Sequence, residues 1–126
     1  MRVSHRSAGE TANIFRRYAR LGLDRRHIAV FEAYDFMRGV CRTEDEAVEL
    51  LSVYDTMRIM AISGRGDCVR AVRAVYFYGA GRRPRRNDVA YRVRRHAFEE
   101  HCDERTVYRR LDYARRVYWL VRKNEV

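Results

Sequence analysis

The last third of the chain carries arginines at a spacing that suits contact with nucleic acid. Arg105, Arg109, Asp112 and Arg116 follow one another at steps of four, three and four residues, with Tyr108 beside them, which places them on one side of a helix. Arginine presents a planar fork of donors that fits guanine edges and phosphates. The row therefore predicts a DNA-reading surface. The alternative is a solvated helix face on which Asp112 pairs with Arg109 and Arg116.

The opposite side of the same segment is apolar. It consists of residues at steps of four, three, four and three: Val107, Leu111, Ala114, Tyr118 and Val121. A helix with one apolar stripe packs that stripe inward and leaves the polar side in water. At 117–121 the apolar residues cover more than half of the helix circumference, so we expect this end to dock on the N-terminal half or on a second subunit.

A second basic segment precedes the fifth predicted helix. Arg82, Arg83, Arg85 and Arg86 surround the single proline, Pro84, and are followed by Asn87. Four adjacent arginines are not buried together, so the segment predicts phosphate contacts beside a DNA groove. About six arginines on phosphates would give a log–log salt slope of roughly −5. A solubilising surface loop is the alternative.

The elements that position these residues are all predicted to be helices. Apolar residues recur at three and four positions, few segments alternate with period two, and glycines and capping residues separate the segments. We expect an all-α fold of about six helices. The expected helices run from Ser7 to about Leu21, from Asp24 to about Arg38, from Thr43 to Ser63, from Asp67 to Gly79, from Asn87 or Asp88 to about His101, and from Asp103 to about Arg122.

Charge divides the chain into two regions. The 126 residues carry a net charge of +10, and 26 of the 27 basic residues are arginine. Residues 1–63 hold 10 arginines and 9 carboxylates, a net +1, whereas residues 64–126 hold 17 basic and 8 acidic groups, a net +9. We interpret 1–63 as a helical region for oligomerisation or partner contact, and 64–126 as the nucleic-acid-binding region.

Other classes of function receive little support from the sequence. Cys41, Cys68 and Cys102 are an odd number without a C-x-x-C pair, which favours free thiols in the cytoplasm. His96, His101 and Cys102 make at most a weak, incomplete metal site. The sequence shows no phosphate-binding glycine loop, catalytic pair, signal peptide or membrane span. We therefore expect neither an enzyme nor a cofactor nor a membrane protein.

The last two predicted helices form a candidate helix-turn-helix. After the turn, Asp103 is a small polar cap, Thr106-Val107 follows at the third and fourth positions, and Ala97 lies six residues before the cap. A rival turn at 21–24 is followed by an apolar and acidic helix, which suits the core or self-association better than a phosphate-lined groove.

Residues 67–122 resemble the four-helix promoter −35-binding module of sigma factors, and more closely the small phage regulators of the ArpU/RinA kind. The resemblance lies in 69–78, Asn87-Asp88, 103–111 and Ala114, and departs from the pattern at Glu100 and His101. It implies that Arg105, Thr106, Tyr108 and Arg109 face the major groove, and that RNA polymerase is a further partner.

These patterns predict a phage or mobile-element transcriptional regulator that binds double-stranded DNA in a sequence-specific way through the helix at 104–122. The alternatives are a protein-interaction module or inhibitor that binds an acidic protein or nucleoprotein, and a binder of RNA or single strands, because aromatics intermix with the arginines. A homodimer remains a candidate assembly.

Overall fold

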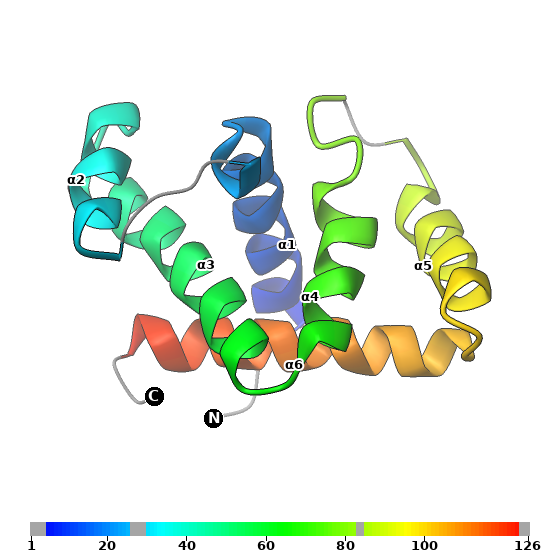
Figure 1. Cartoon of the computed structure of the whole chain (residues 1–126). Coiled ribbons are helices and arrows are strands. Elements are labelled where there is room, and N and C mark those ends of the chain that lie inside the picture. Colours follow the sequence, from blue (N-terminus) through cyan, green and yellow to red (C-terminus); the bar gives the residue numbers. More distant parts are fainter. Residues whose placement is uncertain (1–4, 26–29, 83–84, 124–126) are drawn as a thin grey trace.

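The computed structural model describes residues 5–25, 30–82 and 85–123, and these residues form helices without a strand. The expected all-α fold with about six helices is confirmed. Figure 1 shows the arrangement. The elements are α1 (His5–Arg20), the 3₁₀ turn η1 (Leu23–Arg25), α2 (Val30–Val40), α3 (Glu44–Ile62), α4 (Gly66–Val72), the π-helical segment η2 (Arg73–Phe77), α5 (Asp88–Glu99) and α6 (Glu104–Arg122).

The last helix, α6, lies across the ends of the others. It contacts α1, α3, α4 and α5, and in Figure 1 it forms the base on which α3 and α4 stand. One hydrophobic core runs from Ala12 in α1 to Tyr118 in α6 and includes residues of both charge regions. The net charge of the chain changes at residue 63, but the hydrophobic core continues across this boundary.

The expected boundaries at the N-terminal end are only partly right. Helix α1 begins at His5, so Ser7 lies inside the helix and not at its cap. It ends as expected before Gly22, whose φ of 74° is a left-handed conformation that favours glycine. Asp24 belongs to the 3₁₀ turn, and α2 begins only at Val30, after residues 26–29, which lie outside the described part of the chain.

Two helix caps are confirmed. Thr43 has an extended backbone, and its side chain accepts a hydrogen bond from the backbone N–H of Glu46 at the start of α3. Asp103 does the same for Thr106 at the start of α6. Each cap satisfies a backbone N–H that has no partner within its own helix.

The start of α4 corrects a third expected cap. The helix begins at Gly66, and Asp67 lies in its first turn, where its carboxylate accepts from the backbone N–H of Cys68. The residues at 75–78, Val-Tyr-Phe-Tyr, are of types that favour strands, yet 75–77 are helical. They belong to the wider π-helical segment Arg73–Phe77, and Tyr78 is already extended. Burial of Val75 and Tyr76 in the core decides the conformation here over β propensity.

Helix α5 differs from the expectation at both ends. Asn87 precedes it with a left-handed φ of 68° and forms no side-chain cap, and the helix ends at Glu99, two residues earlier than expected. The helix packs on α6 and η2, and Phe98 is 84% exposed.

None of the described helices combines the length and the apolar character needed to cross a membrane. All three cysteines are free thiols. The C-terminal end of α6 docks on the N-terminal half, as one of the two expected alternatives proposed: the ring of Tyr118 makes an edge contact with Phe15, and Trp119 bonds to Thr11.

Candidate nucleic-acid interface

Helix α6 presents the two faces that its sequence predicts. Val107, Leu111, Ala114 and Tyr118 are buried, and Val121 is half-buried. Arg105, Tyr108, Arg109 and Arg116 are exposed on the other side. Because the helices that α6 contacts all lie on one side of it, the other side is open along the helix (Figure 1). With 19 residues, α6 is about 28 Å long.

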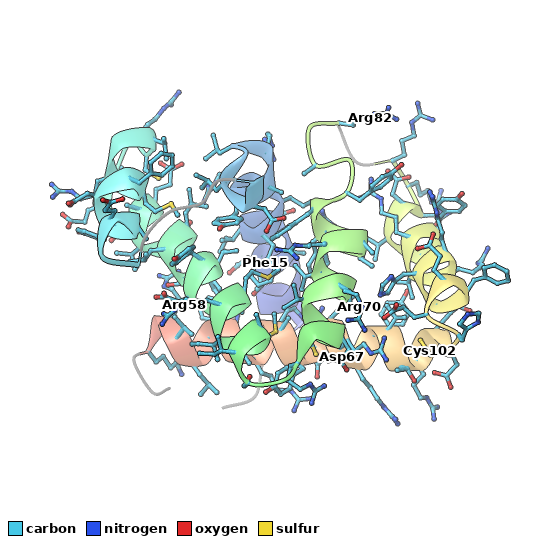
Figure 2. All side chains as sticks on the ribbon, in the orientation of Figure 1. Phe15, Arg58, Asp67, Arg70, Arg82 and Cys102 are labelled. Carbon is cyan, nitrogen blue, oxygen red and sulfur yellow. The ribbon has the colours of Figure 1, made fainter. Side chains whose placement is uncertain are left out.

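Two arginines on the open side form neither a hydrogen bond nor an ion pair in the described part of the chain. Arg105 and Arg109 lie one helical turn apart, and neither forms a hydrogen bond or an ion pair with another described residue. Nitrogen-tipped side chains extend from this side of α6 in Figure 2. Two guanidinium groups that are free, exposed and one turn apart are available to phosphates or base edges without breaking an existing contact.

The remainder of the arginine row is partly used within the protein. Asp112 accepts from Arg116 Nε at 3.1 Å and from Arg115 at 3.2 Å, so Arg109 is not its partner as the solvated-face interpretation expected. The hydrogen bond from Arg116 is the largest influence that holds the pKa of Asp112 below its usual range. Arg115 turns inward and donates to the Tyr76 hydroxyl at 2.6 Å.

The start of α6 is fixed by its cap. Both the backbone N–H and the hydroxyl of Thr106 donate to Asp103 Oδ1 at 2.8 Å. Both bonds lower the pKa of Asp103, and the bond from the hydroxyl has the larger effect. The resemblance placed Thr106 toward the major groove, but its hydroxyl hydrogen is already engaged in the cap. Tyr108, in contrast, is exposed.

The turn between α5 and α6 comprises residues 100–103. His101 takes a left-handed φ of 55°, and the backbone N–H of Cys102 bonds to the carbonyl of Ala97 at 3.0 Å. Ala97 is buried, as a close approach of the two helices requires.

A network of ion pairs around Glu100 holds α4, α5 and α6 together. The Glu100 carboxylate pairs with Arg70 of α4 at 3.0 Å and with Arg110 of α6 at 3.5 Å, and Arg110 also reaches Asp67 of α4 at 3.4 Å. Glu100 is one of the two departures from the resemblance, and here it forms both ion pairs. Sequence reasoning missed this network because its members are 10 to 43 positions apart.

The basic loop and the arginine row on α6 are not brought together. Arg82 lies at the end of the molecule opposite to α6 (Figure 2), and Arg85 and Arg86 immediately precede α5. The 12 residues of α5, about 18 Å of helix, separate this loop from the turn into α6. Arg83 lies outside the described residues, and Asn87 is exposed beside Arg86. The two segments therefore do not form one continuous surface.

Two of the loop arginines instead belong to a cleft that sequence reasoning missed. A cavity of about 1000 Å³ lies between α4–η2 and α5. Its walls include two tyrosines, Tyr78 and Tyr91, a buried histidine, His96, and three carboxylates, Asp88, Glu99 and Glu100. Six arginines complete the lining: Arg70, Arg73, Arg82, Arg85, Arg92 and Arg95.

Within the described residues, no group of three or more His, Cys, Asp or Glu side chains is placed to hold a metal ion. His96 and His101 differ in environment, since His96 is buried and His101 is exposed.

Comparisons with protein-family models, with curated proteins and with solved structures find no match to this chain. The resemblance to sigma-factor-like phage regulators therefore stays a prediction, based on the residues that suggested it.

Proposed function

We propose that the protein binds duplex DNA through the outer face of α6. Arg105 and Arg109 supply the free guanidinium groups, Tyr108 and Arg116 flank them, and the helix lies in the major groove, which is wide enough to admit an α-helix. In this role the protein regulates transcription in the cytoplasm, with RNA polymerase as a further partner, as the resemblance implies.

One observation carries the proposal: Arg105 and Arg109 are exposed and unpaired on a helix whose other side is anchored by four elements. A DNA-reading helix must be held rigidly while its reading side stays free, and the buried Val107, Leu111 and Ala114 hold this one. Most other arginines of the basic region form ion pairs with carboxylates, whereas these two form none and act on the Asp103 carboxylate only beyond ion-pair distance. The basic loop does not contribute to this face, because α5 separates it from α6.

The test is the binding of a fluorescein-labelled 30-base-pair duplex of mixed sequence, followed by anisotropy at low salt. The double variant Arg105→Ala/Arg109→Ala removes the two free guanidinium groups and leaves the buried side of α6 intact. We expect it to weaken binding by about 30-fold or more, since each such contact is worth about 1–3 kcal/mol and two are removed. Circular dichroism checks that the helix content is unchanged.

A matched control removes the same charge elsewhere. Arg20 and Arg42 are exposed and lie at the end of α1 and before α3, away from the outer face of α6. Arg20→Ala/Arg42→Ala should weaken duplex binding less than threefold. Equal losses in the two variants would mean that net charge alone drives binding. Absence of duplex binding by the unchanged protein, with capture of an acidic protein, would favour the interaction module instead.

A further inference from the structure

The cleft between α4–η2 and α5 is the second place where arginines gather, and its chemistry differs from that of α6. Four of its arginines are paired: Arg70 with Glu100, Arg73 with Asp24, Arg92 with Asp88 and Arg95 with Glu99. Arg82 and Arg85 line the same cavity, and neither side chain forms an ion pair within the described residues. The uncompensated positive charge is therefore confined to the end of the cleft next to the loop.

Two exposed aromatic rings line the same cavity. Tyr78 and Tyr91 both line the cavity and are 59% and 60% exposed. Arg82 follows Tyr78 by one tight turn, in which the Arg82 backbone N–H bonds to the Gly79 carbonyl at 3.0 Å. On the other wall, the Arg85 backbone N–H bonds to Asp88 at 2.7 Å, one helical turn before Tyr91. Each free arginine is thus held close in the chain to an exposed ring.

The guanidinium groups of Arg92 and Arg95 lie 5.8 Å from the centre of the Tyr78 ring. Arg92 is fixed further by its hydrogen bond to the Val75 carbonyl of the π-helical segment, at 3.1 Å. The contacts of Arg92 and Arg95 therefore fix the side chains that surround Tyr78 in the cavity wall. π-helical segments inside longer helices occur often at functional sites.

A histidine that lines the cavity keeps a buried polar atom without a hydrogen-bond partner. His96 lines the cavity and is only 5% exposed, and its Nε2 has no hydrogen-bond partner in the described part of the chain. Burial is the main reason why its pKa is lowered, which favours the neutral ring. An unpartnered buried polar atom is unfavourable.

We propose that this cleft binds a nucleotide unit, with the phosphate at Arg82 and Arg85 and the base against Tyr78 and Tyr91. A nucleotide combines an anionic group with a flat aromatic ring, and the cleft offers free guanidinium groups next to exposed tyrosines. A cavity of about 1000 Å³ has room for such a ligand. The unit belongs either to a single strand or to a free nucleotide. The cleft is separate from the outer face of α6, so this inference stands independently of duplex binding.

The experiment uses the whole chain and a fluorescein-labelled (dT)8 strand, with AMP and inorganic phosphate as competitors. The proposal predicts saturable binding of the strand, or of AMP measured by calorimetry, and displacement by AMP at concentrations where inorganic phosphate is ineffective. If AMP binds more tightly than the (dT)8 strand, the ligand is a free nucleotide. If the strand binds more tightly than AMP, the ligand is single-stranded nucleic acid.

Variants then locate the binding. Arg82→Ala/Arg85→Ala and Tyr78→Leu should each weaken it by about 10-fold, whereas Tyr78→Phe should retain it because the ring is kept. Arg86→Ala/Arg20→Ala is the charge-matched control, since Arg86 belongs to the same loop but does not line the cavity. All of these residues are exposed, so the fold should survive, and thermal unfolding verifies this.

Arg105→Ala/Arg109→Ala separates this proposal from the proposed duplex binding, and it should leave nucleotide binding unchanged. The proposal is overturned if neither the strand nor AMP binds, if inorganic phosphate competes as well as AMP, or if a glutamate-rich peptide binds the cleft in their place. It is equally overturned if the α6 variant abolishes strand binding while the cleft variants do not.

Discussion

The indole N–H of Trp119 donates a hydrogen bond of 2.8 Å to the hydroxyl of Thr11, a residue 108 positions earlier in the chain. Thr11 is fully buried in α1, and Trp119 is half-buried near the end of α6. The bond, together with the edge contact between Phe15 and Tyr118, joins the first and last helices. The near-neutral N-terminal region therefore holds the helix that presents the arginine row.

Removal of the Thr11 hydroxyl tests this connection. Thr11→Val keeps the side-chain shape but leaves the Trp119 N–H without its acceptor, so we expect a loss of about 1–2 kcal/mol in the free energy of unfolding. Urea unfolding of the wild type, Thr11→Val, Trp119→Phe and the double variant gives the coupling between the two residues. A coupling of about 1 kcal/mol is expected for a direct hydrogen bond. Strict additivity of the two changes would show that the bond contributes nothing.

The orientation of α6 is tested by two leucines on the same helix. Leu111 is 1% exposed in the core, whereas Leu120 is 39% exposed. Leu111→Ala should therefore destabilise the protein by about 2–5 kcal/mol through lost burial and an unfilled cavity. Leu120→Ala should cost less than about 1 kcal/mol, because part of its side chain already contacts water. Denaturant unfolding measures both, and similar losses at the two positions would mean that α6 is rotated from the described orientation.

The cap of α6 gives the protein a dependence on pH. Hydrogen bonds from Thr106 hold the pKa of Asp103 below its ordinary value, so the ionised carboxylate stabilises the folded state. That contribution is complete above the unfolded pKa of about 4 and is lost as pH falls through the lower folded pKa. Asp103→Ala should lower the melting temperature at pH 7, and its difference from the wild type should shrink between about pH 4 and pH 2.

Thermal unfolding across this pH range checks the prediction. Asp103→Asn serves as the control because asparagine is also a good cap, and it should recover most of the stability at pH 7. A difference between the wild type and Asp103→Ala that stays constant from pH 7 to pH 2 would show that the carboxylate charge plays no part in the cap.

The fold class and the faces of α6 could be predicted because they depend on local patterns. Apolar residues at steps of three and four decide which side of a helix is buried, and the short polar side chains of Thr43 and Asp103 cap helices through bonds to neighbours three residues away. The same local logic failed at Asp67 and Asn87. There the backbone geometry of the preceding turn, including the left-handed φ of Asn87, starts the helix without a side-chain cap.

The arrangement of the basic residues could not be predicted, because it is set by tertiary packing. The loop arginines Arg82, Arg85 and Arg86 and the row on α6 belong to the same basic region of the sequence. In the structure, α5 separates them. The cleft depends on where η2 packs against α5, and the network around Glu100 on where α4 and α5 pack against α6. Periodicity within one helix carries no information on such distances between helices.

The salt dependence of duplex binding tests the central claim most directly, because it counts the phosphate contacts that each variant makes. If Arg105, Arg109 and Arg116 are the contacting arginines, the slope of log Kobs against log salt should be about −3, shallower than the roughly −5 expected had the loop arginines joined them. In Arg105→Ala/Arg109→Ala the slope should become shallower by about 2. An unchanged slope and affinity in that variant would contradict duplex binding by the outer face of α6.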